Sequence, residues 1–494
     1  MDAISQGLSM LLNWQVPLFM VLGVSLGVIF GAIPGLTGSM GIAMTLPLTY
    51  RMPPIVALTF LVSVYTGGNY GGSISAILIN APGSPASAIT GLDGFPLTKK
   101  GKANEALGMA TMASAIGGFI GAAFLFFVME PLARLTLKFG PPEMFMLAVF
   151  GLTVIASLRG KSFVKGLFAG LAGVLLGTIG TTPTGVTRGT MGSLYLMDGI
   201  PTIVALIGFL SISELFMMLD LKYVQGGDAP IETRNFRKLW AGALTVLKYK
   251  GTVLKSSIIG IGVGVMPAAG ATVANILAYN EAKRASKNSE AYGHGSEEGL
   301  IAGETANNAS QGGAMATMLA LGIPGSSATA MLIGALMLHN LIPGPRLFLD
   351  HMPEVYAILT STLIQQVVLL GVGLVFCYYA ATVITIPARV LVPAIALFAA
   401  IGGFAGRNTL FDARLMLFFG LVGWLMKRND YPPIATVLGI ILAPIADREL
   451  IRINQMFSGN YSALLTRPIT VVFFVLSIVS LAYPIYRTYV QKKN

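Results

Sequence analysis

Two short segments of the chain carry residue types that could bind an acid. One holds the turn Pro82-Gly83-Ser84, the other holds Pro324-Gly325-Ser326, and further hydroxyl side chains follow both. Proline and glycine end one helix and the serine can cap the next, with Pro85 at the first helical position in the first segment. A helix N-terminus presents unpaired N–H groups and the positive end of a dipole, and this combination binds carboxylates.

These turns predict a site where two helix ends meet and hold a di- or tricarboxylate. The alternative is that they are tight turns that only pack helices together. The predicted substrate-binding residues are Ser73, Asn80, Gly83, Ser84, Ser87, Gly325, Ser326, Ser327 and Thr329.

A polar stretch precedes each turn, at residues 65–73 and 304–313. Side-chain amides, hydroxyls and unwound backbone carbonyls are hard oxygen ligands that suit a sodium ion. Polar groups inside a bilayer are costly and point to function, although hydrogen bonding between helices is the alternative. The predicted ion-binding residues are Asn69, Gly71, Gly72, Asn307, Asn308, Ser310 and Gln311. Glu304 either carries a proton or sodium ion, or lies at the interface beside the polar loop 283–300.

The two regions resemble each other along the chain. Gly27, Gly31 and Pro34 recur with the same spacing as Gly260, Gly264 and Pro267, and Gly71-Gly72 is followed by a Pro-Gly-Ser turn as Gly312-Gly313 is. Matching elements in the same order over a long period indicate an internal duplication. The predicted structural hinges are Pro34, Gly35, Pro82, Pro267 and Pro324.

The elements that position these residues must lie in a membrane. Apolar residues make up 54% of the chain and charged residues only 11%, against about 25% charged residues in soluble domains. This composition excludes a soluble globular enzyme, a disordered chain and a nucleic-acid-binding domain, so no nucleic acid is expected as a partner. The 494 residues allow roughly 10–13 spans of ~20 residues with their loops.

The basic loops set the expected orientation of the two copies. Loops 90–105, 159–165 and 220–255 are rich in lysine and arginine, and such loops stay in the cytoplasm. The second copy then enters the membrane from the cytoplasm and the first from outside, which is an inverted-topology repeat, typical of secondary transporters.

The predicted fold is therefore an all-α polytopic membrane protein of roughly 10–13 transmembrane helices. It has two inverted-topology repeats, each with a re-entrant or broken-helix motif. The expected division is a first half at 1–219 (motif region 23–105, spans 106–219), a basic cytoplasmic linker at 220–255, and a second half at 256–494 (motif region 256–346, spans 355–488).

Several of these motifs also suggest a family. The chain resembles the large permease subunit of tripartite tricarboxylate transporters at residues 31–38, 46–50, 70–73, 80–88, 93–103, 303–309 and 322–326. The resemblance spans essentially the whole chain. It implies that residues 69–73, 80–87 and 307–329 line the site.

The same resemblance implies a setting for the protein. It implies a multi-pass protein of the bacterial cytoplasmic (inner) membrane, with a small membrane subunit of about four spans and a periplasmic solute-binding protein as partners. It also implies carboxylate substrates and transport driven by a Na⁺ or H⁺ gradient, with no cofactor beyond that ion.

Two other classes of function remain open at this point. One is a membrane channel, which would need a continuous polar pore, or a scaffold subunit without its own carboxylate site. The sequence instead has two local polar breaks. A membrane enzyme would need a clustered acid, base, nucleophile or metal set within the spans, and none is visible; nor is there a phosphate-binding Gly-x-x-x-x-Gly-Lys-Ser/Thr loop. We therefore expect a transporter and not an enzyme, and we favour elevator movement over rocking.

Overall fold

The computed structural model describes residues 2–33, 37–136, 138–156, 163–182, 184–219, 234–266, 270–380, 397, 404, 407 and 409–491. Contacts divide the chain into two units: unit 1 comprises Met1–Pro131 and Asp220–Ile395, and unit 2 comprises Leu132–Leu219 and Ala396–Asn494. Three predicted hinge residues, Pro34, Gly35 and Pro267, lie outside the described residues, as do residues 381–396 of the region 355–488 where spans are predicted.

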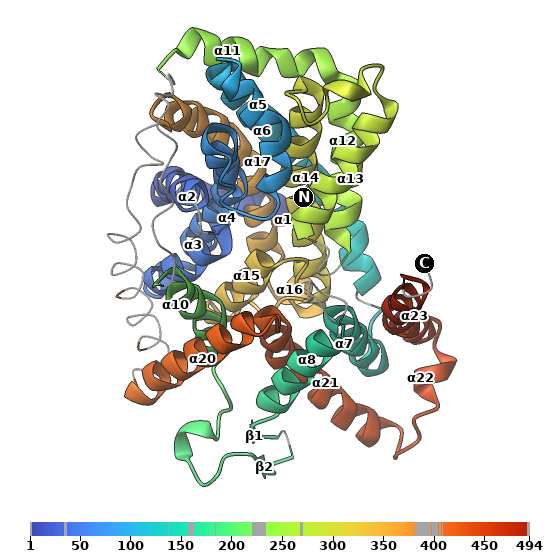
Figure 1. The fold of residues 1–494 in the computed structure, drawn as a ribbon. Coiled ribbons are helices and arrows are strands. Elements are labelled where there is room, and N and C mark those ends of the chain that lie inside the picture. The colour runs from blue at the N-terminus through green and yellow to red at the C-terminus, as the bar shows by residue number, and fades with distance from the viewer. Residues whose placement is uncertain are drawn as a thin grey trace. The chain divides into compact units, whose positions relative to one another are not determined.

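Both units are built from helices, which confirms the predicted all-α class (Figure 1). Three of the described helices are long and apolar enough to cross a membrane: Gln15–Ala32, Ala103–Leu135 and Met352–Tyr378. The predicted total number of spans stays a prediction.

Unit 1 holds both copies of the sequence motif. Its elements are α1 (Asp2–Leu11), α2 (Gln15–Ala32), α3 (Gly38–Thr45), η1 (Leu46–Thr49), α4 (Pro54–Ile79), α5 (Ser87–Lys99), α6 (Ala103–Thr136, which ends in unit 2), α11 (Phe236–Thr245), η4 (Val246–Tyr249), α12 (Lys250–Val265), α13 (Gly270–Ala285), η5 (Ser289–Ala291), α14 (Glu297–Leu321), α15 (Ser327–Leu338), α16 (Pro345–Asp350) and α17 (Met352–Tyr378). Helix α2 packs along α4, and α12 packs along α14.

These two helix pairs cross at equivalent glycines. A Cβ atom on Gly27 would overlap the backbone carbonyl oxygen of Val64, and one on Gly260 would overlap that of Ala306. Only glycine permits so close an approach of two helix backbones. The match of α2 to α12 and of α4 to α14 therefore extends from the sequence to the packing.

The contacts also correct the alignment of the two copies. Gly71 packs against Val28 and Gly31, and the residue that packs in the same way on Gly264 is Gly313. Gly71 thus matches Gly313, and the predicted pairing of Gly71-Gly72 with Gly312-Gly313 is wrong by one residue. The offset is 242 residues for Val64 and Ala306 (306 − 64) and again for Ser84 and Ser326 (326 − 84), because α4 and α14 have no insertion relative to each other.

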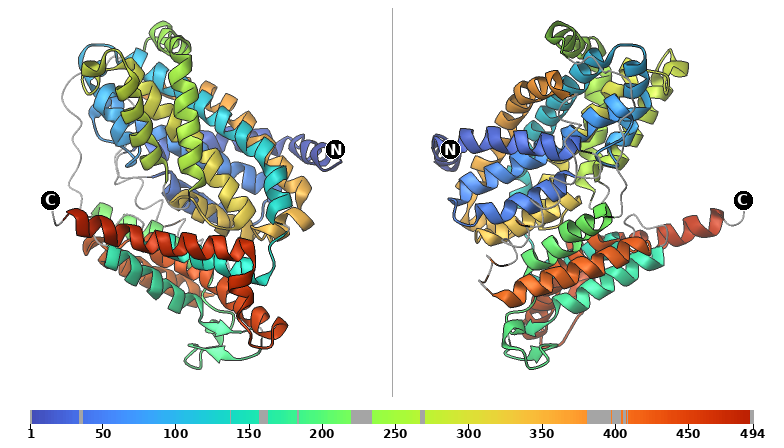
Figure 2. Two further views of the ribbon diagram at one scale, coloured as in Figure 1. Left: turned by 90° about the vertical axis from the view of Figure 1, so that its right-hand side faces the viewer. Right: turned by 60° about the vertical axis from the view of Figure 1, so that its left-hand side comes forward.

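Unit 2 is drawn from the remainder of both halves of the chain. Its elements are α7 (Pro141–Ala156), α8 (Phe163–Gly177), β1 (Gly180–Thr181), β2 (Thr187–Arg188), η2 (Leu194–Leu196), α9 (Thr202–Leu206), the π-helical η3 (Ile207–Ile212), α10 (Ser213–Leu219), α20 (Leu410–Arg428), α21 (Pro433–Met456), α22 (Ala463–Thr466) and α23 (Pro468–Gln491). Helix α21 packs on α7 and α8, and α20 packs on η3 (Figure 2).

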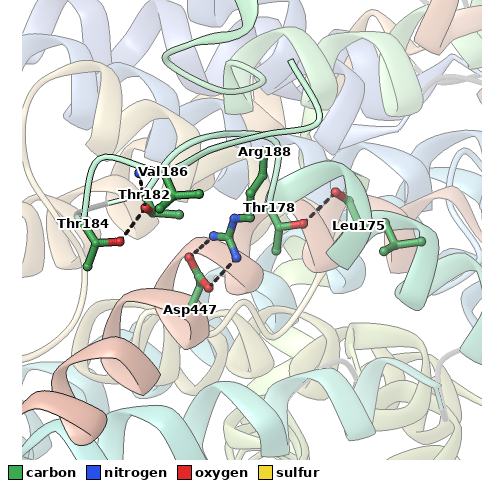
Figure 3. A network of polar contacts seen from close by, with 7 residues as sticks. All are labelled: Leu175, Thr178, Thr182, Thr184, Val186, Arg188 and Asp447. Atoms are coloured by element: carbon green, nitrogen blue, oxygen red, sulfur yellow. Dashed lines mark hydrogen bonds and ion pairs between the residues drawn. The ribbon is translucent and has the colours of Figure 1, made fainter. Parts of the chain in front are cut away.

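Ion pairs hold the ends of the unit 2 helices. Arg188, at the end of the antiparallel β1–β2 hairpin, binds both carboxylate oxygens of Asp447 on α21 (Figure 3). Arg467, just before α23, contacts the buried Glu143 on α7 at 2.7 Å. Contacts to both oxygens of a carboxylate fix the relative orientation of the two side chains in addition to pairing their charges.

The division into units begins a new segment at Asp220, where the predicted basic linker also begins. Each predicted half of the chain therefore contributes one segment to unit 1 and one to unit 2. The described part of the linker is helical, in α11 and η4 and at the start of α12. The assignment of the halves as repeats stays a prediction.

Candidate functional site

Both Pro-Gly-Ser segments interrupt a helix, as predicted. Helix α4 ends at Ile79 and α5 begins at Ser87, and α14 ends at Leu321 and α15 begins at Ser327. The residues that follow the first helix of each pair are Asn80 and Gly322, and both have left-handed backbones, with φ of 53° and 70°. Asparagine and glycine are the residues that adopt this conformation at a helix end most readily.

The two turns carry the same hydrogen bonds. The Ser326 N–H donates to Thr329 Oγ1 (2.9 Å) and the Thr329 N–H donates to Ser326 Oγ (3.2 Å), which is a capping box. In the first copy the Ser84 N–H donates to Ser87 Oγ (3.1 Å) and the Ser87 N–H donates to Ser84 Oγ (3.3 Å). We call residues 84–87 and 326–329 the two tips.

The tips differ in one respect from the prediction. Ser326 caps α15 as expected, but Ser84 is not the cap of α5, because its bonds to Ser87 close a separate turn before that helix begins. The capping box leaves the N–H groups of Ser327 and Ala328 unused in the second tip. In the first tip Pro85 has no N–H, so only that of Ala86 lies between the two serines.

Both tips reach helix α4. A Cβ atom on Gly72 would lie 2.7 Å from Ser87 Oγ and 3.2 Å from Ser84 Oγ, so the first tip rests directly on this glycine. The Tyr65 hydroxyl lies near the side chains of Ser326 and Asn69 and interacts with both. Both tips therefore lie beside the same helix.

A row of hydrogen bonds joins α4 to α14. Ser73 Oγ donates to Glu304 Oε1 (2.7 Å), Asn307 Nδ2 donates to the Asn69 carbonyl (3.0 Å), and Gln311 Nε2 donates to Thr66 Oγ1 (2.7 Å). The numbers rise on α14 as they fall on α4, so these two equivalent helices run antiparallel. We call these six residues, together with Asn308, whose Nδ2 donates to the Glu304 carbonyl at 3.4 Å, the polar seam.

The polar seam contains amide oxygens that have no partner. Asn307 Oδ1, Asn308 Oδ1 and Gln311 Oε1 are buried and accept no hydrogen bond from the described residues. A buried polar atom left unpaired costs about 1–3 kcal/mol, and amide oxygens are ligands for hard cations. The arrangement is therefore suited to a small cation.

The backbone does not contribute as expected. Residues 65–73 and 304–313 are helical throughout, so the expectation of unwound carbonyls in these stretches is wrong. Gly71 and Gly72 lie at close contacts with α2 and with the first tip, and Ser310 Oγ donates to the Asn307 carbonyl at 2.7 Å. Side chains are thus the ligands that remain for an ion.

The other predicted residues lie around the turns. Asn80 is an exposed helix cap, and Pro82 is exposed. Gly83 lies where a Cβ would overlap the Gly31 carbonyl oxygen, and Gly325 lies against Ala314. Pro324 is buried beside Gly325. Glycine is therefore required at both turns for close packing.

Several polar residues of this region were missed by the sequence analysis. Thr66 Oγ1 donates to Gln365 Oε1 of α17 (3.2 Å), and Gln365 Nε2 lies 3.3 Å from Ser361 Oγ. The pair Gln365-Gln366 within the apolar run of α17 was the signal that could have revealed them. These residues extend the hydrogen bonds of the polar seam to a third helix.

Asp93 joins the two copies on another side. Its Oδ1 accepts the backbone N–H groups of Gly293, Gly295 and Ser296 at 2.8–2.9 Å, and its Oδ2 accepts the Tyr279 hydroxyl at 2.9 Å. We call this contact between α5 and the loop 286–296 the Asp93 latch. Its donors satisfy the carboxylate fully, so it has a structural role.

Comparison with known proteins gives consistent results. The Tripartite tricarboxylate transporter TctA family matches residues 18–438. An "Uncharacterized 52.8 kDa protein in TAR-I ttuC' 3'region" of Agrobacterium vitis is 35% identical over 448 residues, which cover 90% of this chain and 88% of that protein. An "Uncharacterized protein in TAR-II ttuC' 3'region" of the same organism is 32% identical over 206 residues, 42% of this chain and 85% of that protein. No solved structure matches the chain.

Proposed function

The chain belongs to the tripartite tricarboxylate transporter TctA family, and from this premise we propose that it imports a di- or tricarboxylate driven by a Na⁺ or H⁺ gradient. Family membership itself makes the chain a membrane transport protein, the large subunit of a transporter with partner subunits. The family is one of transporters.

The observation that carries the substrate proposal is the pair of matching tips beside α4. Each tip holds its hydroxyls and its helix N-terminus in a fixed geometry, and free N–H groups at such an end favour an anion. Two tips beside the same helix suit a molecule with more than one carboxylate. Ser84, Ser326 and Ser327 are the proposed contacts. Ser87 Oγ and Thr329 Oγ1 donate to the carbonyls of Ser84 and Ser326 and hold the tips in shape.

The proposed coupling ion binds in the polar seam. The unpartnered amide oxygens of Asn307, Asn308 and Gln311 are neutral ligands that favour a cation over a carboxylate. A cation bound here would offset the negative charge of the substrate inside the low-dielectric unit. This supports coupled movement of substrate and ion.

The antiparallel run of α4 and α14 supports an inverted-topology repeat, the arrangement that many secondary transporters use. Both tips and the whole polar seam belong to unit 1. We propose that unit 1 carries the substrate in an elevator movement in the inner membrane. A periplasmic solute-binding protein would deliver the substrate, and a small membrane subunit would complete the complex.

Uptake by reconstituted protein tests the proposal. Liposomes that contain the permease and its small subunit receive a labelled tricarboxylate and the binding protein, under a sodium gradient, a proton gradient or neither. We expect accumulation above the outside concentration with one gradient and none without. Equilibration without accumulation under every gradient would instead show the alternative, a channel.

A further inference from the structure

Glu304 lies at one end of the polar seam, and its side chain is fully buried at 0% exposure. Ser73 Oγ donates to its Oε1 at 2.7 Å and Ser114 Oγ of α6 donates to its Oε2 at 2.8 Å. Thr90 Oγ1 of α5 also donates to Oε1. In the described part of the chain no lysine, arginine or histidine pairs with it, and Tyr70 is a titratable side chain close enough to feel its charge.

Packing alone does not require an acid at this place. With the offset of 242 residues, the positions equivalent to Glu304, Ser73 and Thr90 are Val62, Met315 and Leu332. All three are buried and apolar. The duplicated helices therefore pack equally well without a carboxyl group, and a carboxyl inside a membrane segment is costly.

The three hydroxyls around Glu304 can serve two states. In this structure each donates its hydrogen to the carboxylate. Each also lies four residues after a backbone carbonyl, of Asn69, Ala86 or Ala110, to which a serine or threonine in a helix can donate instead. The Asn69 and Ala86 carbonyls already accept Asn307 Nδ2 and Asn275 Nδ2, so there the hydroxyl would share the acceptor. In that second arrangement the hydroxyl oxygens and the carboxylate oxygens all present lone pairs to the space between them, where a cation can bind.

We propose that Glu304 with Ser73, Thr90 and Ser114, the carboxylate cage, binds the coupling cation. This rests on the proposed ion-driven transport and names the group that carries its charge. One carboxylate is balanced by one monovalent cation, either Na⁺ or H⁺. Without the cation the cage is negative, and moving that charge through a low-dielectric region costs far more than moving a neutral pair.

The cage also connects the cation to the substrate. Thr90 lies on α5, three residues after Ser87, so one short helix carries a cage hydroxyl and a tip hydroxyl. A cation bound beside Glu304 would contact Thr90 Oγ1 on this helix. Cation binding thereby positions the first tip, which couples the two ligands.

The test compares wild type with Glu304→Gln in liposomes. Exchange of labelled for unlabelled tricarboxylate across the membrane needs no gradient, and accumulation does. We expect Glu304→Gln to retain exchange and to lose gradient-driven accumulation at least tenfold. A sodium gradient at equal pH and a proton gradient without sodium identify the cation in the wild type, and either identity supports the proposal.

Two variants keep the test decisive. Ser114→Ala removes one cage hydroxyl and should raise the apparent cation constant about tenfold while coupling persists, a result that holds even if Glu304→Gln does not fold. Glu281→Gln changes a carboxylate at the exposed end of α13, paired with Arg284, and should transport as wild type does. Unchanged cation dependence in Glu304→Gln and Ser114→Ala overturns the proposal, whereas absent transport by the wild type overturns the proposed function instead.

Discussion

The two tip serines are equivalent in position but differ in what surrounds them. The second tip leaves two unused N–H groups, of Ser327 and Ala328, and the first leaves one, because Pro85 has none. We expect Ser326→Ala to raise the apparent substrate constant about tenfold, and Ser84→Ala about threefold. The concentration dependence of uptake measures both.

Thr329→Ser is the matched control for the tip variants, because it keeps the hydroxyl of the capping box. It should leave the substrate constant within about twofold of wild type. Unchanged substrate constants in Ser84→Ala and Ser326→Ala would show that the tips only pack helices together and do not bind the substrate.

The amide oxygens of the polar seam should respond to the ion and not to the substrate. Asn308→Ala removes an unpartnered buried oxygen, and we expect the apparent cation constant to rise several-fold while the substrate constant stays constant. Titrating the coupling ion during uptake shows the shift. Ser257→Ala is the control, because it removes a buried hydroxyl of α12 that donates to the Val253 carbonyl. An equal rise of the cation constant in this variant would show that the polar seam does not bind the ion specifically.

At the scale of elements, the helix crossings depend on glycine. Gly260→Ala would place a Cβ 2.5 Å from the Ala306 carbonyl oxygen, whereas Gly262 on the same helix has open space. We expect Gly260→Ala to lower the thermal unfolding temperature in detergent and Gly262→Ala to leave it unchanged or raise it slightly. Equal behaviour of the two variants would contradict the close crossing of α12 and α14.

The Asp93 latch holds a loop that contains an exposed lysine, Lys287. Asp93→Asn weakens charge-assisted bonds, each of about 1.5–3 kcal/mol, so trypsin should cleave after Lys287 several-fold faster than in wild type. Glu290→Gln changes an exposed acid of the same loop and should not alter the rate. An unchanged cleavage rate in Asp93→Asn would show that the Asp93 latch does not hold the loop.

Local signals explain what could be predicted at this scale. Pro82-Gly83 and Pro324-Gly325 end helices through their own backbone preferences, so the breaks were visible in the sequence. The hydroxyls of Thr90 and Ser114 meet Glu304 only because α5, α6 and α14 pack together, and nothing near them in the sequence marks this. The unwound carbonyls were expected because glycine suggested irregular backbone, whereas these glycines serve close helix contact.

At the scale of the whole molecule, orientation can be tested with engineered cysteines. Cys377 is buried, and Cys377→Ala gives a background without thiols. On that background, Lys238→Cys in the basic segment should react with an impermeant maleimide only after the membrane is permeabilised, since basic loops face the cytoplasm. Met191→Cys in the loop after β2, which the charge pattern places outside, should react in intact cells, and the reverse result would invert the topology.

The division of the chain into two units was beyond the sequence analysis. Charge and hydropathy located the junction near residue 220, but they describe the chain in order and cannot show that residues 1–131 associate with 220–395. That association depends on contacts between helices far apart in the chain, such as the polar seam. The duplication was the one signal that related these distant segments.

The hydrogen-bonded turns at the two tips have a further consequence for how ligands bind. Each tip already satisfies its own hydroxyls, so it holds its bound-state geometry before an acid arrives and little order is gained on binding. The carboxylate cage is the opposite case, because its three hydroxyls must rotate away from Glu304 to admit a cation. Substrate binding should therefore require little reorganisation of the tips, whereas cation binding must first break three hydrogen bonds to Glu304, so the reorganisation during loading belongs to the smaller ligand.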